Sequence, residues 1–400
     1  MKNCFFKIQK INKFFLTLVF YFIFLQNTHA EYITFSEFNF CMDLPEGFEL
    51  IEASQTGDSF FFETKSMPVK FALKFCPTEK YSTPKNALED TLNQLNAKGA
   101  IEKIDWYGRE CFLTTFSFVM PDQKLYTGWA FCIQVPLIND PSTKSNILFL
   151  TYADNQISRD CDQFMLSIID SVFFCQEDFR RPGPVTTFAF PKSTENEIIL
   201  TIGGKKIISS IDNDAITRSQ FVIDREYAVL KIYANHKAWK EAWQRYYRQI
   251  FRESYSSLKK IANDIYKALL PIAQKKSFLT PQEEILKMLL DWVQDFEYKR
   301  DRSNSDFTAV TASVQGVGCD CDSRSLLMCI LMEHMGIKSE LFISREYSHA
   351  IFGLALNKKG ALINVDGTDF ILGETTAKVD FGLIAKEHRD TNKWIPVDLP

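Results

Sequence analysis

The stretch GVGCDCDSRSLLMCILMEHMG, residues 316–336, joins a glycine-containing loop to a run of large apolar side chains. From Cys321 onward this run is apolar on nearly every side of a helix, and it ends at Gly336, a residue type that commonly follows a last helical turn. Helices that are apolar all round lie inside a protein core. The stretch therefore predicts a central, buried helix beginning at Cys321, with the rest of a domain packed around it.

Cysteines at three positions of this stretch differ in their expected chemistry. Cys321 occupies the first helical turn, where unpaired backbone N–H groups and the positive end of the helix dipole favour a thiolate. Cys329 lies two turns further along, where a packed apolar role is expected, and Cys319 lies in the preceding loop. Cys321 is the predicted nucleophile and Cys319 the alternative. Asp320 and Asp322 flank Cys321, and nearby negative charge raises a thiol pKa, so activation is expected to need a base.

The candidate bases are the four histidines that follow residue 30. His334 lies on the same predicted helix, where the helical rise places it about 20 Å from Cys321. His236 begins a separate amphipathic helix, and His388 lies in the charged run KEHRD, which indicates an exposed loop. His349 instead belongs to the predicted strand YSHAIFGLAL, which can hold an imidazole rigidly against a neighbouring element. His349 is therefore the predicted base.

Two further residues complete the predicted site. The strand ALINVDGTD follows a short turn at residues 357–360, and Asp366 at its end is predicted to orient His349 and to stabilise its protonated form. The backbone N–H of Cys321 is a predicted oxyanion donor. Gln315, six residues before Cys321, is a second candidate donor. The alternative, to which we give equal weight, is that Gln315 is a loop residue without a catalytic role.

The order of these features resembles the core of the transglutaminase-like cysteine peptidase superfamily: Cys321 first on a helix, Gly336-Ile337 after it, His349-Ala350 on one strand and Asp366 on the next. The resemblance covers roughly residues 280–370 and implies a papain-like α+β core that performs acyl transfer through a Cys-His-Asp triad. Carried onto this chain, the triad is Cys321, His349 and Asp366. Cys319 stands where the family often has glycine, and Gly367 stands where it has proline, but neither difference removes a catalytic atom.

The first thirty residues are expected to be a secretory signal peptide. Four lysines precede the apolar run FFLTLVFYFIFL, which is too short to span a bilayer as a helix, and small residues follow in QNTHA. Cleavage near Glu31 is expected to leave a periplasmic or secreted protein without a stable membrane anchor. Removing these lysines from 46 basic residues leaves 42 against 50 acidic residues, a net charge of −8, which argues against a nucleic-acid partner.

A first domain is predicted at residues 31–178. Its short apolar runs predict strands (FSEFNFCMDL, SFFFET, KFALKF, CFLTTFSFVM, GWAFCIQV and ILFLTY), and helices are predicted from Thr83-Pro84 to Gly99 and after Ser158. This pattern, with the opening FCMDLPEGFEL, resembles PsbP/Mog1-like modules of exported bacterial proteins. The predicted fold class is therefore α+β, with an antiparallel α/β sandwich domain before a papain-like/transglutaminase-like core.

The segment QEDFRRPGPV, residues 176–185, combines charge with Pro-Gly-Pro and predicts an interdomain linker at residues 179–185. The second domain then covers residues 186–400, with a strand hairpin and helices at 186–279 and the catalytic core at 280–400.

Four elements are predicted in the first half of this second domain. Gly203-Gly204 predicts a tight hairpin turn, and YAVLKIY, residues 227–233, a further strand. A helix from His236 to about Leu270 is expected to bury an aromatic stripe and to expose its arginines, and a capping box at Thr280 begins the next helix.

No metal or other cofactor is expected, because Cys319-x-Cys321 lacks a second ligand pair and the chain has no His-Glu-x-x-His. Nine cysteines follow residue 30, and the sequence leaves their pairing open. The predicted function is an exported thiol hydrolase, a peptidase or amidase acting on protein or peptide substrates in the cell envelope or outside the cell. The alternatives are a protein cross-linking transglutaminase and a non-catalytic protein that binds envelope polypeptides.

Overall fold

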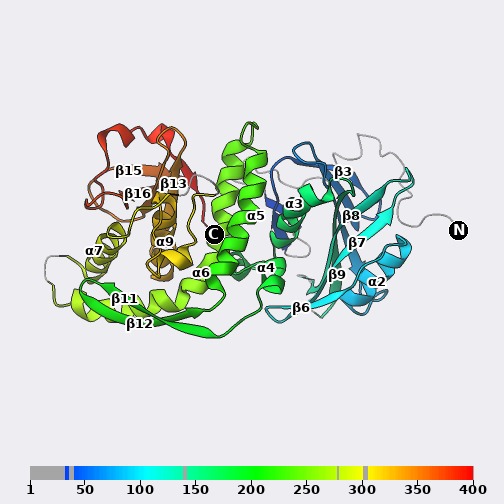
Figure 1. Ribbon diagram of the computed structural model, residues 1–400, viewed down its shortest axis with the longest axis horizontal. Coiled ribbons are helices and arrows are strands. Elements are labelled where there is room, and N and C mark those ends of the chain that lie inside the picture. Colours follow the sequence, from blue (N-terminus) through cyan, green and yellow to red (C-terminus); the bar gives the residue numbers. More distant parts are fainter. Residues whose placement is uncertain (1–31, 36–39, 138–141, 277–278, 301–304, 400) are drawn as a thin grey trace. The chain divides into compact units, whose positions relative to one another are not determined.

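The computed structural model describes residues 32–35, 40–137, 142–276, 279–300 and 305–399 (Figure 1). The chain divides into two compact units, Met1–Val172 and Phe173–Pro400, each with its own helices and antiparallel sheet. This confirms the α+β class. The predicted signal peptide, residues 1–30, and the expected cleavage position at Glu31 lie outside the described residues.

The first unit is built on a seven-stranded antiparallel sheet. In spatial order its strands are β3 (Phe48–Ala53), β4 (Ser59–Thr64), β5 (Lys70–Pro77), β9 (Lys144–Asp154), β8 (Leu125–Pro136), β7 (Arg109–Val119) and β6 (Glu102–Trp106). A three-stranded sheet adds β1 (Tyr32–Phe35), β2 (Phe40–Asp43) and β10 (Val172–Phe173). Each predicted strand run overlaps one of these strands, although residues 36–39 of the run FSEFNFCMDL lie outside the described residues, and β3, β6 and β10 were not predicted.

Successive residues of a strand point to opposite faces of the sheet, and one helix packs on each face. Helix α2 (Pro84–Gln94) buries Leu88 with Cys132 and Leu148, which belong to one face. Helix α3 (Ser158–Asp170) contacts the same strands, and its Phe164 lies on the aromatic cluster that includes Phe149. Thr83 caps α2 as predicted, but the helix ends at Gln94 and does not continue to Gly99.

The second unit is arranged around helix α9 (Cys321–His334), whose apolar residues from Leu326 to Met332 are all fully buried. A five-stranded antiparallel sheet covers it, in the order β15 (Leu362–Val365), β16 (Thr368–Gly373), β14 (His349–Leu354), β13 (Ser339–Ser344) and β17 (Ile395–Val397). Helices α6 (Trp239–Ala273), α7 (Pro281–Gln294) and α8 (Val310–Ser313) also contact α9 (Figure 1). The prediction of a central, buried helix is confirmed.

Other predictions for this unit are confirmed by local geometry. Gly203 and Gly204 both have positive φ, as a tight hairpin turn requires, and join β11 (Glu195–Ile202) to β12 (Lys205–Asp212). Thr280 and Glu283 form the capping box that begins α7.

The predicted strand at residues 227–233 is wrong, because these residues continue helix α5 (Ala215–Ile232). The buried side of α5 includes Arg225 and Glu226, so its helical spacing cannot be seen from apolar residues alone. Arg225 donates to Glu226, and Arg245 of α6 donates to the other oxygen of the same carboxylate. The expectation that the arginines of α6 are solvated is therefore also wrong, since Arg245 is only 2% exposed.

The predicted linker is structured and partly buried. It contains the short helices η2 (Gln176–Arg180) and α4 (Pro184–Ala189), and the division between the units falls earlier, after Val172. Asp178 is fully buried and accepts a hydrogen bond from the backbone N–H of Phe174, while Arg252 of α6 donates to the Asp178 carbonyl. Residues 176–185 thus belong to the core of the second unit.

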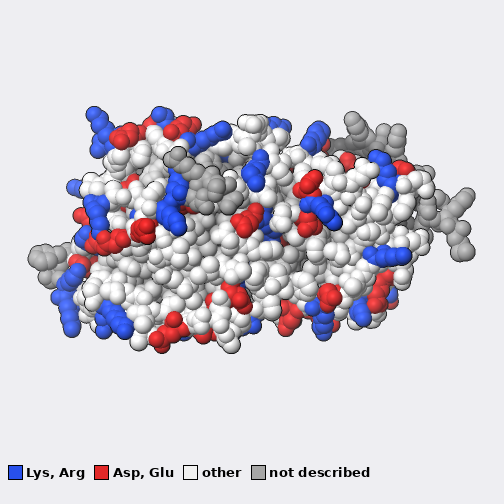
Figure 2. Space-filling view, in the orientation of Figure 1, with Lys and Arg blue, Asp and Glu red and all other residues white. Residues whose placement is uncertain are grey.

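Three further properties of the described part of the chain bear on function. None of its helices has the length and apolar character needed to cross a membrane. All nine of its cysteines are free thiols. On the face drawn in Figure 2, acidic and basic side chains are interspersed over each unit.

Candidate active site at the start of helix α9

Cys321 begins helix α9, and its thiol faces strand β14. Asp320 caps the helix by accepting a hydrogen bond from the backbone N–H of Ser323 at 3.2 Å. The Cys321 Sγ accepts the backbone N–H of Ala350 and donates to Asp322 Oδ1 at 3.1 Å. Ala350 directly follows His349 on β14, so the thiol of the predicted nucleophile lies against the strand that begins with the predicted base.

The resting thiol of Cys321 is neutral. Burial raises its pKa well above the ordinary value, and the negative charges of Asp322 and Asp320 raise it further. The Ala350 N–H opposes this effect but does not reverse it. Helix position alone therefore does not produce a thiolate here, in agreement with the expectation that activation depends on a base.

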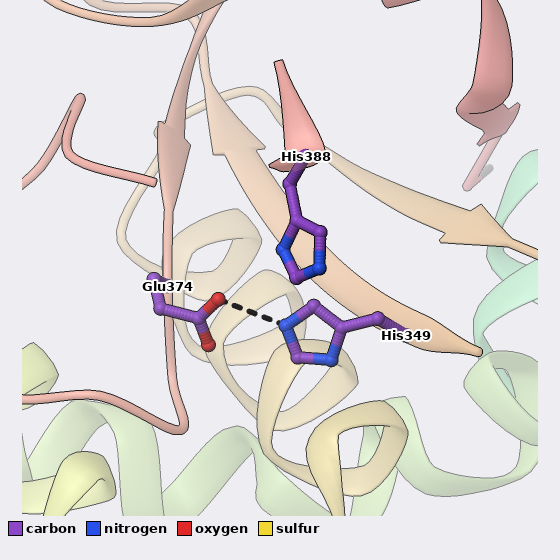
Figure 3. Close-up of side chains that lie close together, drawn as sticks. All are labelled: His349, Glu374 and His388. Carbon is purple, nitrogen blue, oxygen red and sulfur yellow. Dashed lines mark hydrogen bonds and ion pairs between the residues drawn. The ribbon is translucent and has the colours of Figure 1, made fainter. Parts of the chain in front are cut away.

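His349 is held by a buried carboxylate. Its Nε2 lies 2.8 Å from Oε2 of Glu374, the residue that follows β16, and Glu374 is 4% exposed (Figure 3). The other oxygen, Oε1, accepts from the backbone N–H and the hydroxyl of Thr376, each at 2.7 Å. Burial opposes ionisation of Glu374, but the bonds from His349 and Thr376 outweigh it and keep the pKa of Glu374 below its usual value.

The prediction that Asp366 orients His349 is wrong, and the strand order gives the reason. A short turn after β14 was expected to return the chain antiparallel beside it, which would bring Asp366 back to His349. Instead β16 lies between β15 and β14, and Asp366 forms the β15–β16 hairpin turn. Because Gly373 pairs with Phe352, this turn lies roughly 25 Å from His349 along the strands.

The same strand order explains why Glu374 takes the position by His349. Strand β16 runs antiparallel to β14, so its last residues return to the end where β14 begins.

Asp366 instead has the geometry of a turn residue. It is exposed with φ +49°, and Gly367 has φ +81°, the pair of positive angles that an Asp-Gly hairpin turn adopts.

Gln315 and Cys319 are not directed at the thiol of Cys321. Gln315 is exposed, and its side-chain amide donates to the Thr311 carbonyl at 3.1 Å, one turn earlier in its own segment. Cys319 is fully buried, and burial raises its pKa. Its Sγ is hydrogen-bonded to Ser313 and Arg324.

The structure adds Tyr298, which sequence reasoning missed. Its backbone bridges Cys319 in parallel, and its side chain is 51% exposed. Burial of the phenol and the nearby Cys321 and Asp320 raise the pKa of Tyr298 to about 12, so it keeps its proton and can donate a hydrogen bond. A bridge between residues in separate loops has no signal in the sequence.

A second histidine lies beside His349, contrary to the prediction that His388 is in an exposed loop. His388 ends the short helix η3 (Lys386–His388) and is half-buried, with its ring 5.1 Å from that of His349. The Trp394 ring lies next to both imidazoles, and the Tyr347 ring lies next to those of His388 and Trp394. The ligand atoms of His349, Glu374 and His388 all lie within 4.8 Å of one another, so these three residues could hold a metal ion (Figure 3).

The charge on Asp320 gives a testable pH dependence. Burial and the neighbouring Asp322 raise the pKa of Asp320 to about 7, so its charge opposes the Cys321 thiolate only as the pH rises through that value. We predict that Asp320→Asn increases alkylation of Cys321 by up to about tenfold above pH 7, since one pKa unit changes the thiolate fraction tenfold. Below pH 7 the variant and the parent should converge. The rate is measured by site-resolved mass spectrometry with iodoacetamide.

The control for this experiment is Asp264→Asn, which removes a carboxylate on α6 that pairs with Lys260 at 2.9 Å. It should leave the profile unchanged. Asparagine still caps a helix, so Asp320→Asn preserves the start of α9. Slower alkylation of Asp320→Asn above pH 7 would contradict the proposed repulsion.

Comparisons with known proteins give weak similarities only. No family model and no curated protein matches the chain. Among solved structures, cyanobacterial PsbP (CyanoP) from Synechocystis sp. PCC 6803 is 9% identical with a TM-score of 0.29, covering 37% of this chain and 94% of that one. A protein from Bacteroides thetaiotaomicron is 10% identical with a TM-score of 0.25, covering 55% and 76%.

A candidate cysteine protease from Cytophaga hutchinsonii is 12% identical with a TM-score of 0.23, covering 88% of this chain and 74% of that one. The similar structures thus include a PsbP protein and a candidate cysteine protease, the two classes that the sequence resembles. All three TM-scores are below 0.3, so they assign neither fold nor chemistry to this chain.

Proposed function

We propose that the second unit is a thiol hydrolase, a peptidase or amidase, that cleaves protein or peptide amides through an acyl-enzyme on Cys321. One arrangement supports the proposal: the Cys321 thiol accepts a hydrogen bond from the backbone N–H of Ala350, the residue after His349, and His349 is held by the buried Glu374. A nucleophile, a base and a carboxylate that orients the base are the parts that acyl transfer requires.

The two ring nitrogens of His349 have different roles in the proposed mechanism. Nε2 is bound to Glu374, which leaves Nδ1 to take the thiol proton. The resulting imidazolium is stabilised by Glu374, and the thiolate attacks the substrate carbonyl carbon. Nδ1–H then protonates the leaving amine as the C–N bond breaks, and a thioester remains on Cys321. Water, deprotonated by His349, attacks the thioester, so that the acid leaves and the thiol re-forms.

The developing oxyanion needs donors in the same place. The backbone N–H of Cys321 lies in the first turn of α9, where helical N–H groups have no partner within the helix. Tyr298 is the second donor that we propose, in place of Gln315, because its protonated phenol is close to Cys321 and partly open to solvent.

Asp322 sets the resting state of the site. It accepts the Cys321 S–H bond and is itself held by the Tyr247 hydroxyl. Burial raises the pKa of Asp322, which weakens its tendency to carry a full negative charge beside the thiol. We propose that substrate binding turns the thiol from Asp322 toward His349.

Hydrolysis and amine transfer differ in how far water is excluded from the thioester. The sequence near Cys321 and His349 is poor in large aromatics, which favours hydrolysis. The structure brings Trp394 to 6.3 Å from the His349 ring and Tyr347 to 5.3 Å from Trp394, and this observation favours the cross-linking alternative. The contacts of these two rings are with the imidazoles of His349 and His388 and with each other, so we retain hydrolysis as the proposed outcome.

A single assay separates the two outcomes. The protein is given a glutamine-containing peptide and a fluorescent primary amine, and released acid or ammonia is measured beside amine incorporation. We predict that hydrolysis exceeds incorporation at millimolar amine, because water at roughly 55 M competes for an open thioester. Cys321→Ala serves as the blank for both products. More incorporation than hydrolysis would establish the cross-linking reading instead.

The remaining alternative is a non-catalytic protein that binds envelope polypeptides, since a fold does not fix a function. A binding protein of this kind should release no acid or ammonia and incorporate no amine. Its Cys321 should also resist alkylation in the folded protein. An exported location and an envelope or extracellular substrate stay part of the proposal and rest on the sequence of residues 1–30.

A further inference from the structure

We propose that His349, Glu374 and His388 form a binding site for Zn²⁺, and that the bound ion blocks the thiol chemistry of Cys321. The three residues come from separate elements: the start of β14, the segment after β16 and the end of η3 (Figure 3). Metal binding is inferred from this geometry alone. Inhibition also rests on the proposed function, because it requires His349 to be the base.

The donor set suits zinc. Two imidazoles and one carboxylate, with an open fourth position, are ligands that Zn²⁺ binds in proteins. Zinc ligands lie about 2.0–2.2 Å from the ion, so their atoms are about 3.3 Å apart in a tetrahedron. His349 Nε2 and Glu374 Oε2 are 2.8 Å apart, and all three ligand atoms lie within 4.8 Å of one another. Side-chain movements of about 1 Å are therefore enough to reach zinc geometry.

His388 provides an independent observation. Its Nδ1 atom is buried, and among the described residues it has no hydrogen-bond partner. Buried polar atoms are normally satisfied, so an unsatisfied imidazole nitrogen beside another histidine and a carboxylate calls for an explanation. The backbone of His388 is also fixed, since its carbonyl accepts from the Trp394 indole at 2.9 Å.

Glu374 is prepared to act as a ligand. Its Oε1 is held by Thr376, which leaves Oε2 directed at the cluster, and hydrogen bonds of this kind orient metal-binding carboxylates.

A bound ion would affect the Cys321 thiol because His349 is both a proposed zinc ligand and the proposed base. An ion on Nε2 of His349 replaces its hydrogen bond to Glu374 and adds positive charge to the ring, so His349 can no longer accept a proton at Nδ1 efficiently. The thiol of Cys321 then stays neutral and unreactive. Loss of zinc would restore the pair of His349 and Glu374.

Binding is tested on the full chain with Zn²⁺ alone, after treatment with a chelator, by isothermal titration calorimetry. His388→Gln and Glu374→Gln should each weaken binding by at least about tenfold, since even residues outside the ligand set cost 10–100-fold. His236→Gln makes the same change at a histidine on another segment and should bind as the parent does. Cys321→Ala should also bind normally, which separates this site from the thiol.

Cobalt gives a readout that does not depend on activity. Co²⁺ at the cluster should show visible ligand-field bands without a sulfur-to-metal charge-transfer band, and His388→Gln should lose them. A charge-transfer band would place the metal on one of the nine thiols and overturn the site. Equal binding by His388→Gln and the parent, or no binding, would overturn it too.

Inhibition is measured as iodoacetamide labelling of Cys321 with and without one equivalent of Zn²⁺, each variant against its own metal-free rate. We expect at least tenfold slower labelling of the parent, and no effect of zinc on His388→Gln. Zinc binding through His388 in a protein without thiol activity would refute the proposed function and leave the metal site standing. Zinc-dependent peptide hydrolysis by Cys321→Ala would overturn the inhibitory role, because the ion would then be catalytic.

Discussion

Cys321→Ala is expected to lower turnover of a peptide amide by about 10⁵–10⁶-fold, the loss seen when a triad nucleophile is removed. The variant lacks the only atom in the proposed mechanism that bonds to the substrate. The side chain is small and already packed at the start of α9, so the fold should survive the change. Activity is measured as release of a fluorescent amine from peptide amides, with circular dichroism as the check on folding.

Two other cysteines of the same stretch provide matched controls. Cys329→Ala removes a sulfur that is fully buried eight residues further along α9, and Cys319→Ala removes the alternative nucleophile. Both variants should keep turnover within a few-fold of the parent. Loss of activity in Cys319→Ala with retention in Cys321→Ala would move the nucleophile to the loop and refute the assignment.

Glu374→Gln is expected to lower turnover by ~10²–10⁴-fold, because an amide cannot stabilise the His349 imidazolium and its NH₂ group can select the wrong imidazole tautomer. Glutamine keeps the size of the side chain, and Oε1 can still accept from Thr376. The KM should change much less than kcat, since Glu374 contacts His349 rather than the substrate in this proposal.

Asp366→Asn is the informative comparison, because Asp366 is the residue that the sequence alone selects for this role. It lies in the exposed β15–β16 turn, and asparagine also tolerates the positive φ found there. Turnover should stay within about twofold of the parent. A large loss in Asp366→Asn together with an active Glu374→Gln would show that the strand order around His349 is not the one described.

The central helix α9 could be predicted from the sequence because its local pattern is unusually strong. Apolar residues on nearly every side, a cysteine at the start and Gly336 at the end define its position without tertiary information. The capping box at Thr280 and the Gly203-Gly204 turn are equally local. Such signals depend on neighbouring residues only, so they can be interpreted before the fold is known.

Helix α5 was missed because charged residues occupy its buried side. Arg225 and Glu226 are each only 1% exposed, paired with one another and with Arg245 on α6. A buried ion pair interrupts the apolar periodicity, and the partner that makes burial tolerable comes from a different helix. Only the tertiary structure reveals that compensation.

Two of the three residues of the proposed triad could be predicted from the sequence, and the third could not. Cys321 and His349 sit at the starts of elements with clear patterns, whereas Glu374 follows a strand whose neighbour is decided by sheet order. The turn-forming character of Asp366-Gly367 was a signal that could have warned against a catalytic role. His388 had no such signal, since its position depends on a distant segment returning to β14.

The most direct test of the proposed chemistry is to trap the acyl-enzyme with an activated ester such as p-nitrophenyl acetate and to locate the adduct by mass spectrometry. We predict one acetyl thioester on Cys321 that forms quickly in the parent, slowly in His349→Ala, and not at all in Cys321→Ala. Acetylation that is spread over several cysteines, or that reaches Cys321 at the same rate with and without His349, would contradict the account.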